Sequence, residues 1–243
     1  MKQSIFSIKE NTSLTSTVYK MVLQGDISEI TAPGQFVNIK LEGFYLRRPI
    51  SVCDAENNEL TIIYKVVGKG TKQMAQTEKG ELDILTGLGN GYDLSKAGNK
   101  PLLIGGGVGV PPMYMLCKQL INMGKDVTVI LGFNTKDEVF YKEEFENLGA
   151  KVFVTTVDGS MGTKGFVTDQ MDRQYSYFYT CGPEPMLKAV YKKSVTSGQF
   201  SFEERMGCGF GACMGCSCKT VTGCKRICKD GPVLEKEEIL WEI

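Results

Sequence analysis

The sequence predicts three parts in order: an antiparallel β-barrel, an α/β domain with a parallel sheet, and a small cysteine-rich module. Strand-like runs separated by turn signals occupy residues 1–97, and strand and helix patterns alternate over residues 98–200. Glycine and cysteine then dominate up to Cys228. We therefore expect a barrel domain at 1–97, an α/β domain at 98–200 and a metal-binding module at 201–243.

The first part carries three clear strand signals, over residues 17–23, 35–41 and 60–67. These runs are rich in β-branched and aromatic residues, and turn clusters such as 32–34 and 54–58 precede two of them. Short strands at this spacing are typical of a small antiparallel barrel. One helix is expected over residues 71–76.

The second part predicts four strands and three helices in alternation. The strands are expected at 101–104, 126–132, 151–156 and 175–180, and the helices at 112–123, 138–148 and 184–197. Alternating strands and helices predict a parallel sheet with right-handed crossovers.

Composition excludes several classes of function. The 28 basic and 28 acidic residues balance, so we expect neither nucleic acid nor an anionic membrane surface as partner. No apolar run reaches the roughly 20 residues of a membrane span, and residues 1–13 lack a signal-peptide core, so the expected location is the cytoplasm. Histidine is absent, which excludes a Ser-His-Asp triad, a His-ligated zinc or haem and a Rieske centre.

Six of the nine cysteines lie between Cys208 and Cys228. Cys208, Cys213 and Cys216 have the C-x4-C-x2-C spacing of plant-type 2Fe–2S sites. The interspersed glycines permit the backbone turns that a loop around a cluster needs. A zinc knuckle is the alternative, but it usually pairs two C-x2-C units or uses histidine. The pattern therefore favours a 2Fe–2S cluster.

The fourth cluster ligand is open among Cys218, Cys224 and Cys228. Only one residue separates Cys218 from Cys216, which leaves it little reach toward a second iron. Cys228 is favoured because the turn sequence Lys229–Pro232 follows it and fixes its position.

Residues Arg47 to Ser51 predict a phosphate and flavin contact at a strand end. A guanidinium binds pyrophosphate well, and the N-terminus of a helix beginning near Gly70 and Thr71 is a second phosphate site. Ser51 is expected to hydrogen-bond a flavin nitrogen. Each signal alone also fits an exposed strand edge or an ordinary helix cap.

Two glycine-containing turns predict a pyridine-nucleotide site. The first follows a buried strand and holds Gly105, Gly106, Gly107 and Gly109; the second holds Cys181, Gly182 and Pro183. Asp158 ends the intervening strand at the same edge of the sheet. Neither a clear NAD-type acid nor an arginine clamp follows the next strand, so the pattern does not choose between NAD and NADP.

With these motifs in order, the chain resembles the ferredoxin-NADP reductase superfamily over its whole length. More narrowly, it resembles the electron-transfer subunits of class B, NAD-dependent dihydroorotate dehydrogenases. The matching FAD residues are Arg48, Pro49, Ile50, Ser51, Ile63, Tyr64, Lys65, Gly70 and Thr71; the nucleotide turns and the cysteines Cys208, Cys213, Cys216 and Cys228 match as well. Ile50 replaces a tyrosine of many reductases, and the narrower family is expected to have an aliphatic residue there.

The resemblance implies an oxidoreductase subunit with FAD, a 2Fe–2S cluster and NAD as cofactors. It implies a partner, an FMN-containing dihydroorotate dehydrogenase catalytic subunit, in a heterotetramer with two of each chain that serves pyrimidine biosynthesis. Dihydroorotate is then oxidised in the partner, so no catalytic acid or base is expected here. Two alternatives remain: a subunit of another electron-transfer complex, such as a sulfide dehydrogenase or an NADH-dependent ferredoxin reductase, or a non-enzymatic zinc-binding module.

Overall fold

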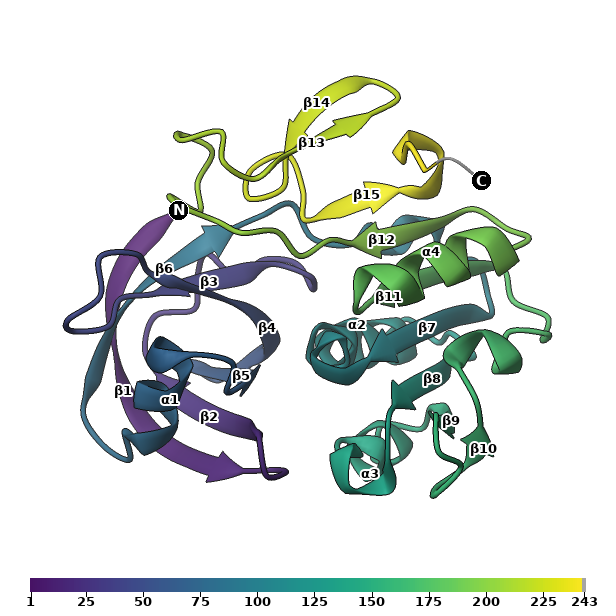
Figure 1. The fold of residues 1–243 in the computed structure, drawn as a ribbon, viewed down its shortest axis with the longest axis horizontal. Helices are drawn as coiled ribbons and strands as arrows, with labels where there is room; N and C mark the ends of the chain where they lie inside the picture. Colours follow the sequence, from purple (N-terminus) through teal and green to yellow (C-terminus); the bar gives the residue numbers. More distant parts are fainter. Residues whose placement is uncertain (242–243) are drawn as a thin grey trace.

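The computed structural model describes residues 1–241, and its first part is a closed six-stranded barrel (Figure 1). The strands are β1 (Lys2–Ser13), β2 (Val18–Gln24), β3 (Phe36–Ile39), β4 (Arg48–Glu56), β5 (Glu59–Lys65) and β6 (Glu81–Leu88). They close in the order β1-β2-β5-β4-β3-β6, and every neighbouring pair is antiparallel. Helix α1 (Lys69–Gln76) follows β5.

The second part is a seven-stranded sheet in the order β10-β9-β8-β7-β11-β12-β15. Its strands are β7 (Pro101–Gly106), β8 (Thr128–Phe133), β9 (Lys151–Thr156), β10 (Thr163–Lys164), β11 (Tyr177–Cys181), β12 (Gly198–Ser201) and β15 (Val233–Glu235). Its helices are α2 (Pro111–Asn122), α3 (Lys142–Asn147) and α4 (Glu184–Lys193). Short 3-10 turns are η1 (Leu94–Lys96), η2 (Gly107–Gly109), η3 (Lys136–Glu138), η4 (Val167–Gln170) and η5 (Lys236–Glu238).

The C-terminal segment lies across the top of both domains (Figure 1). It contains the hairpin β13 (Ser217–Thr220) and β14 (Gly223–Arg226), joined by the cysteine-rich loop before it to the end of β12. The chain then returns to the large sheet, where β15 pairs antiparallel with β12. The cysteine-rich segment is thus anchored at both ends by the α/β sheet.

Helix α2 joins the barrel to the sheet. Its apolar residues Met113, Leu116 and Leu120 are fully buried with strand residues of the sheet, and the same helix packs on β4 of the barrel. Lys118 of α2 reaches Asp54 Oδ2 at 2.9 Å and Glu56 Oε2 at 2.7 Å, both on β4. One apolar core and one ion-pair cluster therefore set the angle between the two domains.

The predicted fold class is confirmed by these two domains, whereas several element bounds differ. Arg48 opens β4, so the Arg-Pro-Ile-Ser run begins a strand and does not close one. The last helix ends at Lys193 because residues 194–197 are β-branched or serine, and strand β12 follows. The helix expected over 138–148 is shortened to α3, after Tyr141 in a left-handed conformation. Within residues 1–241, no helix is long and apolar enough to cross a membrane.

Candidate functional site

A phosphate cradle forms where β4 meets α1. The Arg48 side chain lies so close to Gly70 that a Cβ there would overlap the guanidinium. Arg48 also donates to the Leu46 carbonyl at 2.5 Å and covers the Phe44 ring at 4.6 Å from its centroid. The Thr71 hydroxyl accepts from the N–H of Val67 at 3.0 Å and so fixes the turn before α1. A fixed guanidinium beside a helix N-terminus fits a pyrophosphate.

A cavity of about 780 Å³ lies beside this cradle, between the barrel and the sheet. The predicted residues that line it are Pro49, Ser51, Ile63, Tyr64, Lys65, Gly106, Gly107, Gly109, Cys181, Gly182 and Pro183. The barrel strands β4 and β5 thus face the two glycine turns of the sheet. Of the other predicted residues, Ile50, Gly70, Gly105 and Asp158 do not line it, and Arg48 and Thr71 line an adjoining cavity.

The two glycine turns pack directly on each other. A Cβ at Gly109 would overlap the carbonyl of Cys181, so β7 and β11 end in backbone contact. Burial raises the pKa of the Cys181 thiol to about 12, so this group is a neutral thiol at physiological pH. A neutral, close-packed wall of backbone and thiol fits a flat aromatic ring such as nicotinamide.

One end of the cavity carries a free hydroxyl that the sequence pattern did not reveal. Thr155 lines the cavity, and its Oγ1 is buried without a hydrogen-bond partner in the structure. Asp158, the residue predicted here, is instead tied to its own turn: it accepts from the N–H and hydroxyl of Ser160 at 2.9 and 2.6 Å. These bonds lower the pKa of Asp158 and keep it ionised.

The four predicted ligand cysteines form two pairs. The N–H of Cys213 donates to the sulfur of Cys208 at 3.5 Å, and the N–H of Cys228 donates to the sulfur of Cys216 at 3.4 Å. Burial alone would raise the pKa of Cys208, but the N–H groups of Phe210, Cys213 and Ala212 lower it to about 6. Burial, followed by the neighbouring Cys216, raises the pKa of Cys228 to about 12. The N–H of Gly211, which donates to the Cys228 sulfur at 3.1 Å, lowers this pKa but does not offset the rise.

The four cysteines supply the soft thiolate donors that the predicted cluster needs. Within residues 1–241, no group of three or more His, Cys, Asp or Glu side chains is arranged to hold a metal ion. Cys208, Cys213 and Cys216 lie on the loop before β13, and Cys228 follows β14. N–H groups are directed at the sulfurs of Cys208, Cys216 and Cys228, and a dinuclear cluster needs two thiolates on each iron with donors around the sulfurs. The residues therefore fit a 2Fe–2S group in chemistry and pairing.

The two remaining cysteines of the segment lie on the hairpin that follows the loop. Cys218 is on β13 and Cys224 on β14, where Cys224 is exposed. Neither hydrogen-bonds to the sulfur of a predicted ligand among the contacts described for residues 1–241.

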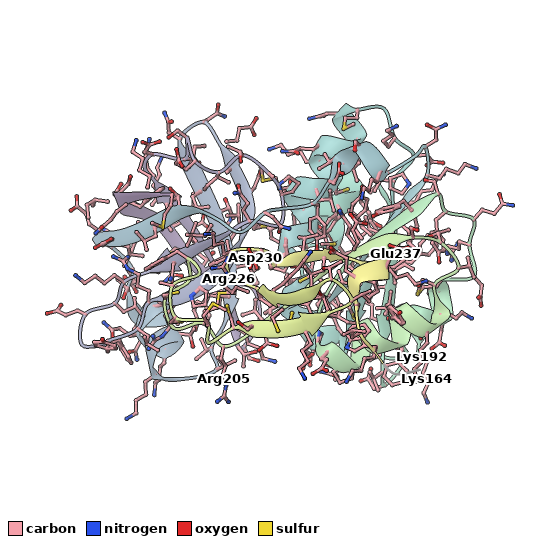
Figure 2. The ribbon with its side chains drawn as sticks, turned by 90° about the horizontal axis from the view of Figure 1, so that it is seen from above. Lys164, Lys192, Arg205, Arg226, Asp230 and Glu237 are labelled. Carbon is pink, nitrogen blue, oxygen red and sulfur yellow. The ribbon has the colours of Figure 1, made fainter. Side chains whose placement is uncertain are left out.

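An ion pair between Arg226 and Asp230, which no sequence motif predicts, fixes the cysteine loop through a hydrogen bond to its backbone. Arg226 and Asp230 lie side by side on the C-terminal module (Figure 2), with Nε to Oδ2 at 2.9 Å and Nη2 to Oδ1 at 3.1 Å. Arg226 Nη1 also donates to the Gly211 carbonyl at 3.0 Å. Arg226 and Asp230 lie on either side of Cys228 in the sequence. An arginine and an aspartate four residues apart are the sequence pattern that allows such an ion pair.

The cysteine loop also contacts the barrel, beside the cavity of about 780 Å³ that lies between the barrel and the sheet. Phe36 of β3 lines the cavity and packs in one apolar cluster with Cys216 and Cys228. Met206, from the segment before the loop, also lines the cavity and packs against this cluster. Two side chains thus separate the cavity from the paired thiols.

Comparison with known proteins identifies both C-terminal parts. Residues 203–240 match the iron-sulfur cluster binding domain of dihydroorotate dehydrogenase B, and residues 103–192 match an oxidoreductase NAD-binding domain. The dihydroorotate dehydrogenase B (NAD(+)) electron transfer subunit of Fusobacterium nucleatum is 45% identical over 96% of each chain. That of a Geobacillus species is 43% identical over 99% of each.

The chain belongs to the family of dihydroorotate dehydrogenase B electron transfer subunits. This confirms the predicted family, the nucleotide-binding part and the iron–sulfur module, while the exact domain boundaries and site residues stay predictions. As a member of the family the chain is an oxidoreductase subunit.

Solved structures agree with this fold. A chain from the structure of an NADH-dependent reduced ferredoxin-NADP oxidoreductase, described in work on flavin-based electron bifurcation, has a TM-score of 0.89 and 30% identity, covering 97% of this chain and 90% of that one. A ferredoxin NADP+ reductase from Neisseria gonorrhoeae with bound FAD and NADP has a TM-score of 0.69 at 16% identity, over 79% of this chain and 90% of that one. The second likeness concerns the fold alone.

Proposed function

We propose that this chain is the electron transfer subunit of an NAD-dependent dihydroorotate dehydrogenase, and that it passes electrons between a partner's FMN and NAD⁺. The observation that carries the proposal is the position of the paired thiols, one side-chain layer from the cavity that joins the flavin and nucleotide motifs. When bound, FAD exchanges a hydride with the nicotinamide, and the 2Fe–2S cluster carries single electrons.

The chain's own residues then bind and orient. Arg48 and the N-terminus of α1 hold the pyrophosphate of FAD, and Ser51, which lines the cavity, hydrogen-bonds the flavin ring. Gly106 to Gly109 and Cys181 to Pro183 form the wall against which the nicotinamide packs. Cys208, Cys213, Cys216 and Cys228 ligate the cluster.

The proposed partner is an FMN-containing catalytic subunit, in a heterotetramer with two copies of each chain. The cluster loop exposes Phe210 and Met214, 43% and 54% accessible, next to the thiols. Exposed apolar side chains beside a redox centre suit an electron-transfer contact. The expected compartment is the cytoplasm, where thiolate ligands stay reduced.

A role in another electron-transfer complex is less well supported. The relatives at 43–45% identity carry the dihydroorotate dehydrogenase name, whereas the ferredoxin-NADP oxidoreductase chain is 30% identical. A zinc-binding module is disfavoured because residues 203–240 match an iron-sulfur cluster binding domain.

The test is to purify the chain alone and together with a candidate FMN subunit. Alone, it is expected to oxidise NADH with artificial acceptors and to leave dihydroorotate unchanged. The complex is expected to reduce NAD⁺ with dihydroorotate. Dihydroorotate turnover by the isolated chain, or a colourless zinc-containing preparation, would contradict the proposal.

A further inference from the structure

Strand β4 and helix α2 each carry part of the proposed site at one end and part of an ion-pair cluster further along, and α2 lies beside β4 (Figure 1). Ser51 of β4 lines the cavity between the barrel and the sheet, and Asp54 lies three residues after it on the same strand. Helix α2 begins at Pro111, two residues after the end of η2, the glycine turn that lines the same cavity. Lys118 of α2 pairs with Asp54. The same two elements therefore hold the facing walls of the cavity and the contact that ties these walls together.

The ion pair lies at similar distances from the two walls. Asp54 is three residues from Ser51, which corresponds to roughly 10 Å along a β-strand. Lys118 is seven residues from Pro111, which corresponds to roughly 10 Å along an α-helix. A tilt of about 6° at the ion pair would therefore move one wall against the other by about 1 Å, and a misplacement of that size can slow a positioned reaction about a hundredfold.

A bulge in β4 turns Asp54 toward α2. Strict alternation would place Asp54 on the same face as Val52, which is fully buried in the barrel core. The pairing of β4 with β5 shifts register between these two residues, so that Cys53 is the extra residue. Cys53 is buried in the apolar cluster that contains the α2 residues, and Asp54 follows it toward Lys118. Glu56, two positions further along β4, pairs with the same lysine.

Lys118 gives this junction a directional contact. Burial of apolar surface is non-directional, so the core around α2 holds the domains together but does not by itself select one angle between them. The Lys118 ammonium contacts two carboxylates at different points of β4, and two contacts along one strand define how α2 crosses it. The side chains of Lys118 and Asp54 are 23% and 21% exposed, so salt screens this pair less than a pair on the open surface.

We propose that Lys118, through Asp54 and Glu56, is a positioning residue for hydride transfer. It holds the flavin wall on β4 and the nicotinamide wall at the start of α2 at the distance that the transfer needs. The inference rests on the proposed function, since it takes FAD and NAD as the ligands of these walls. The step is FAD + NADH → FADH⁻ + NAD⁺, in which the C4–H bond of the nicotinamide breaks and the hydride, with both bonding electrons, bonds to N5 of the flavin.

The test follows reduction of the FAD-loaded chain by NADH at the flavin absorption, under anaerobic conditions and over a range of NADH concentrations. Lys118→Met is expected to lower the limiting rate about tenfold and to leave the half-saturating NADH concentration unchanged, because Lys118 does not line the cavity. Lys118→Arg keeps the charge and is expected to restore most of the rate. Lys142→Met, which breaks an ion pair with Glu146 within α3, is the matched control and is expected to change neither quantity.

A second readout does not depend on turnover. Reduced flavin stacked on NAD⁺ gives a long-wavelength absorption, which is expected to weaken in Lys118→Met, while Tm changes little because partly exposed ion pairs contribute little to stability. Asp54→Asn is expected to lower the rate similarly, and the double variant is expected to lose no more than either single one, as residues that act through one contact do.

An unchanged rate and absorption in Lys118→Met would overturn the inference and leave the proposed function standing. A loss that Lys142→Met shares, or a parallel loss of NADH affinity, would overturn it in the same way. A wild-type chain whose flavin NADH does not reduce would contradict the proposed function itself.

Discussion

The Asn38 side chain of the barrel donates a hydrogen bond to the carbonyl of Cys208 at 3.2 Å, across 170 positions of sequence. Asn38 is 1% exposed, and a Cβ at the neighbouring Gly209 would overlap its amide nitrogen. A barrel strand that lines the flavin cavity therefore also holds the first cysteine of the predicted cluster. The distance between the two cofactor sites is set by this contact together with Phe36.

Replacing Asn38 by alanine is expected to loosen the cluster loop without unfolding the barrel. The part-buried carbonyl of Cys208 loses its donor, at a cost of about 0.5–1.5 kcal/mol. Iron release to a chelator, followed by loss of visible absorption, is expected to become several-fold faster while FAD stays bound. Asn99→Ala, an exposed position, is the matched control. Unchanged iron release in the Asn38 variant would show that the contact does not hold the loop.

The pairing of thiols predicts which fourth cysteine ligates the cluster. Cys228→Ser is expected to remove most of the cluster's visible absorption, because Cys216 would lose its partner on the same iron. Cys218→Ser and Cys224→Ser are expected to keep about two irons per chain, as plant-type 2Fe–2S sites do. Iron and sulfide analysis of the three variants decides the assignment, and full iron content in Cys228→Ser would refute it.

Gly70 and Gly68 provide a matched pair for testing the phosphate cradle. An added methyl group at Gly70 overlaps the Arg48 guanidinium, whereas one at Gly68 meets no atom within 4 Å. Gly70→Ala is expected to weaken FAD binding about tenfold by displacing a charge-assisted contact. Helix propensity favours alanine, so thermal stability of the flavin-free protein should not fall. Equal FAD affinity in both variants would mean that Arg48 does not bind the pyrophosphate.

The fold class could be predicted because its signals are local and repeated. Alternating strand and helix patterns reveal the parallel sheet, and C-x4-C-x2-C needs only a short window of sequence. The sequence does not predict strand β12, because its four residues are all buried and carry no alternation, and they begin only five residues after the end of α4. These residues form a strand because they pair with β11 and β15, which are contacts that the local sequence does not reveal.

The missed parts of the site depend on contacts between distant segments. Asn38 sits in a short buried strand with no motif around it, and its partner lies in another module. Asp158 is predicted because it ends a strand at the edge where the glycine turns lie, but in the structure it bonds its own turn, while Thr155 carries no motif that would predict its place in the cavity. Spacing predicts three cysteine ligands, whereas the position of Cys228 beside Cys216 follows only from the fold.

Glu235 predicts how stability changes with pH, because it fastens the end of the cysteine segment to the α/β domain. It accepts from Lys96 at 2.6 Å, Tyr177 at 2.7 Å and Gln199 at 2.7 Å. Burial by itself raises the pKa of Glu235, but these three bonds hold it below the ordinary value of 4.5. The stabilisation is therefore complete above about pH 4.5 and is lost as the pH falls through the lowered pKa.

Glu235→Gln is expected to reduce Tm by about 2–6 °C at pH 7, which corresponds to about 1–2 kcal/mol, and the gap to wild type should narrow below pH 4. Glu237→Gln, on the same turn with a single bond to Ser197, serves as control in thermal melts between pH 3.5 and 7. A gap that widens toward low pH would reverse the sign and contradict this role for Glu235.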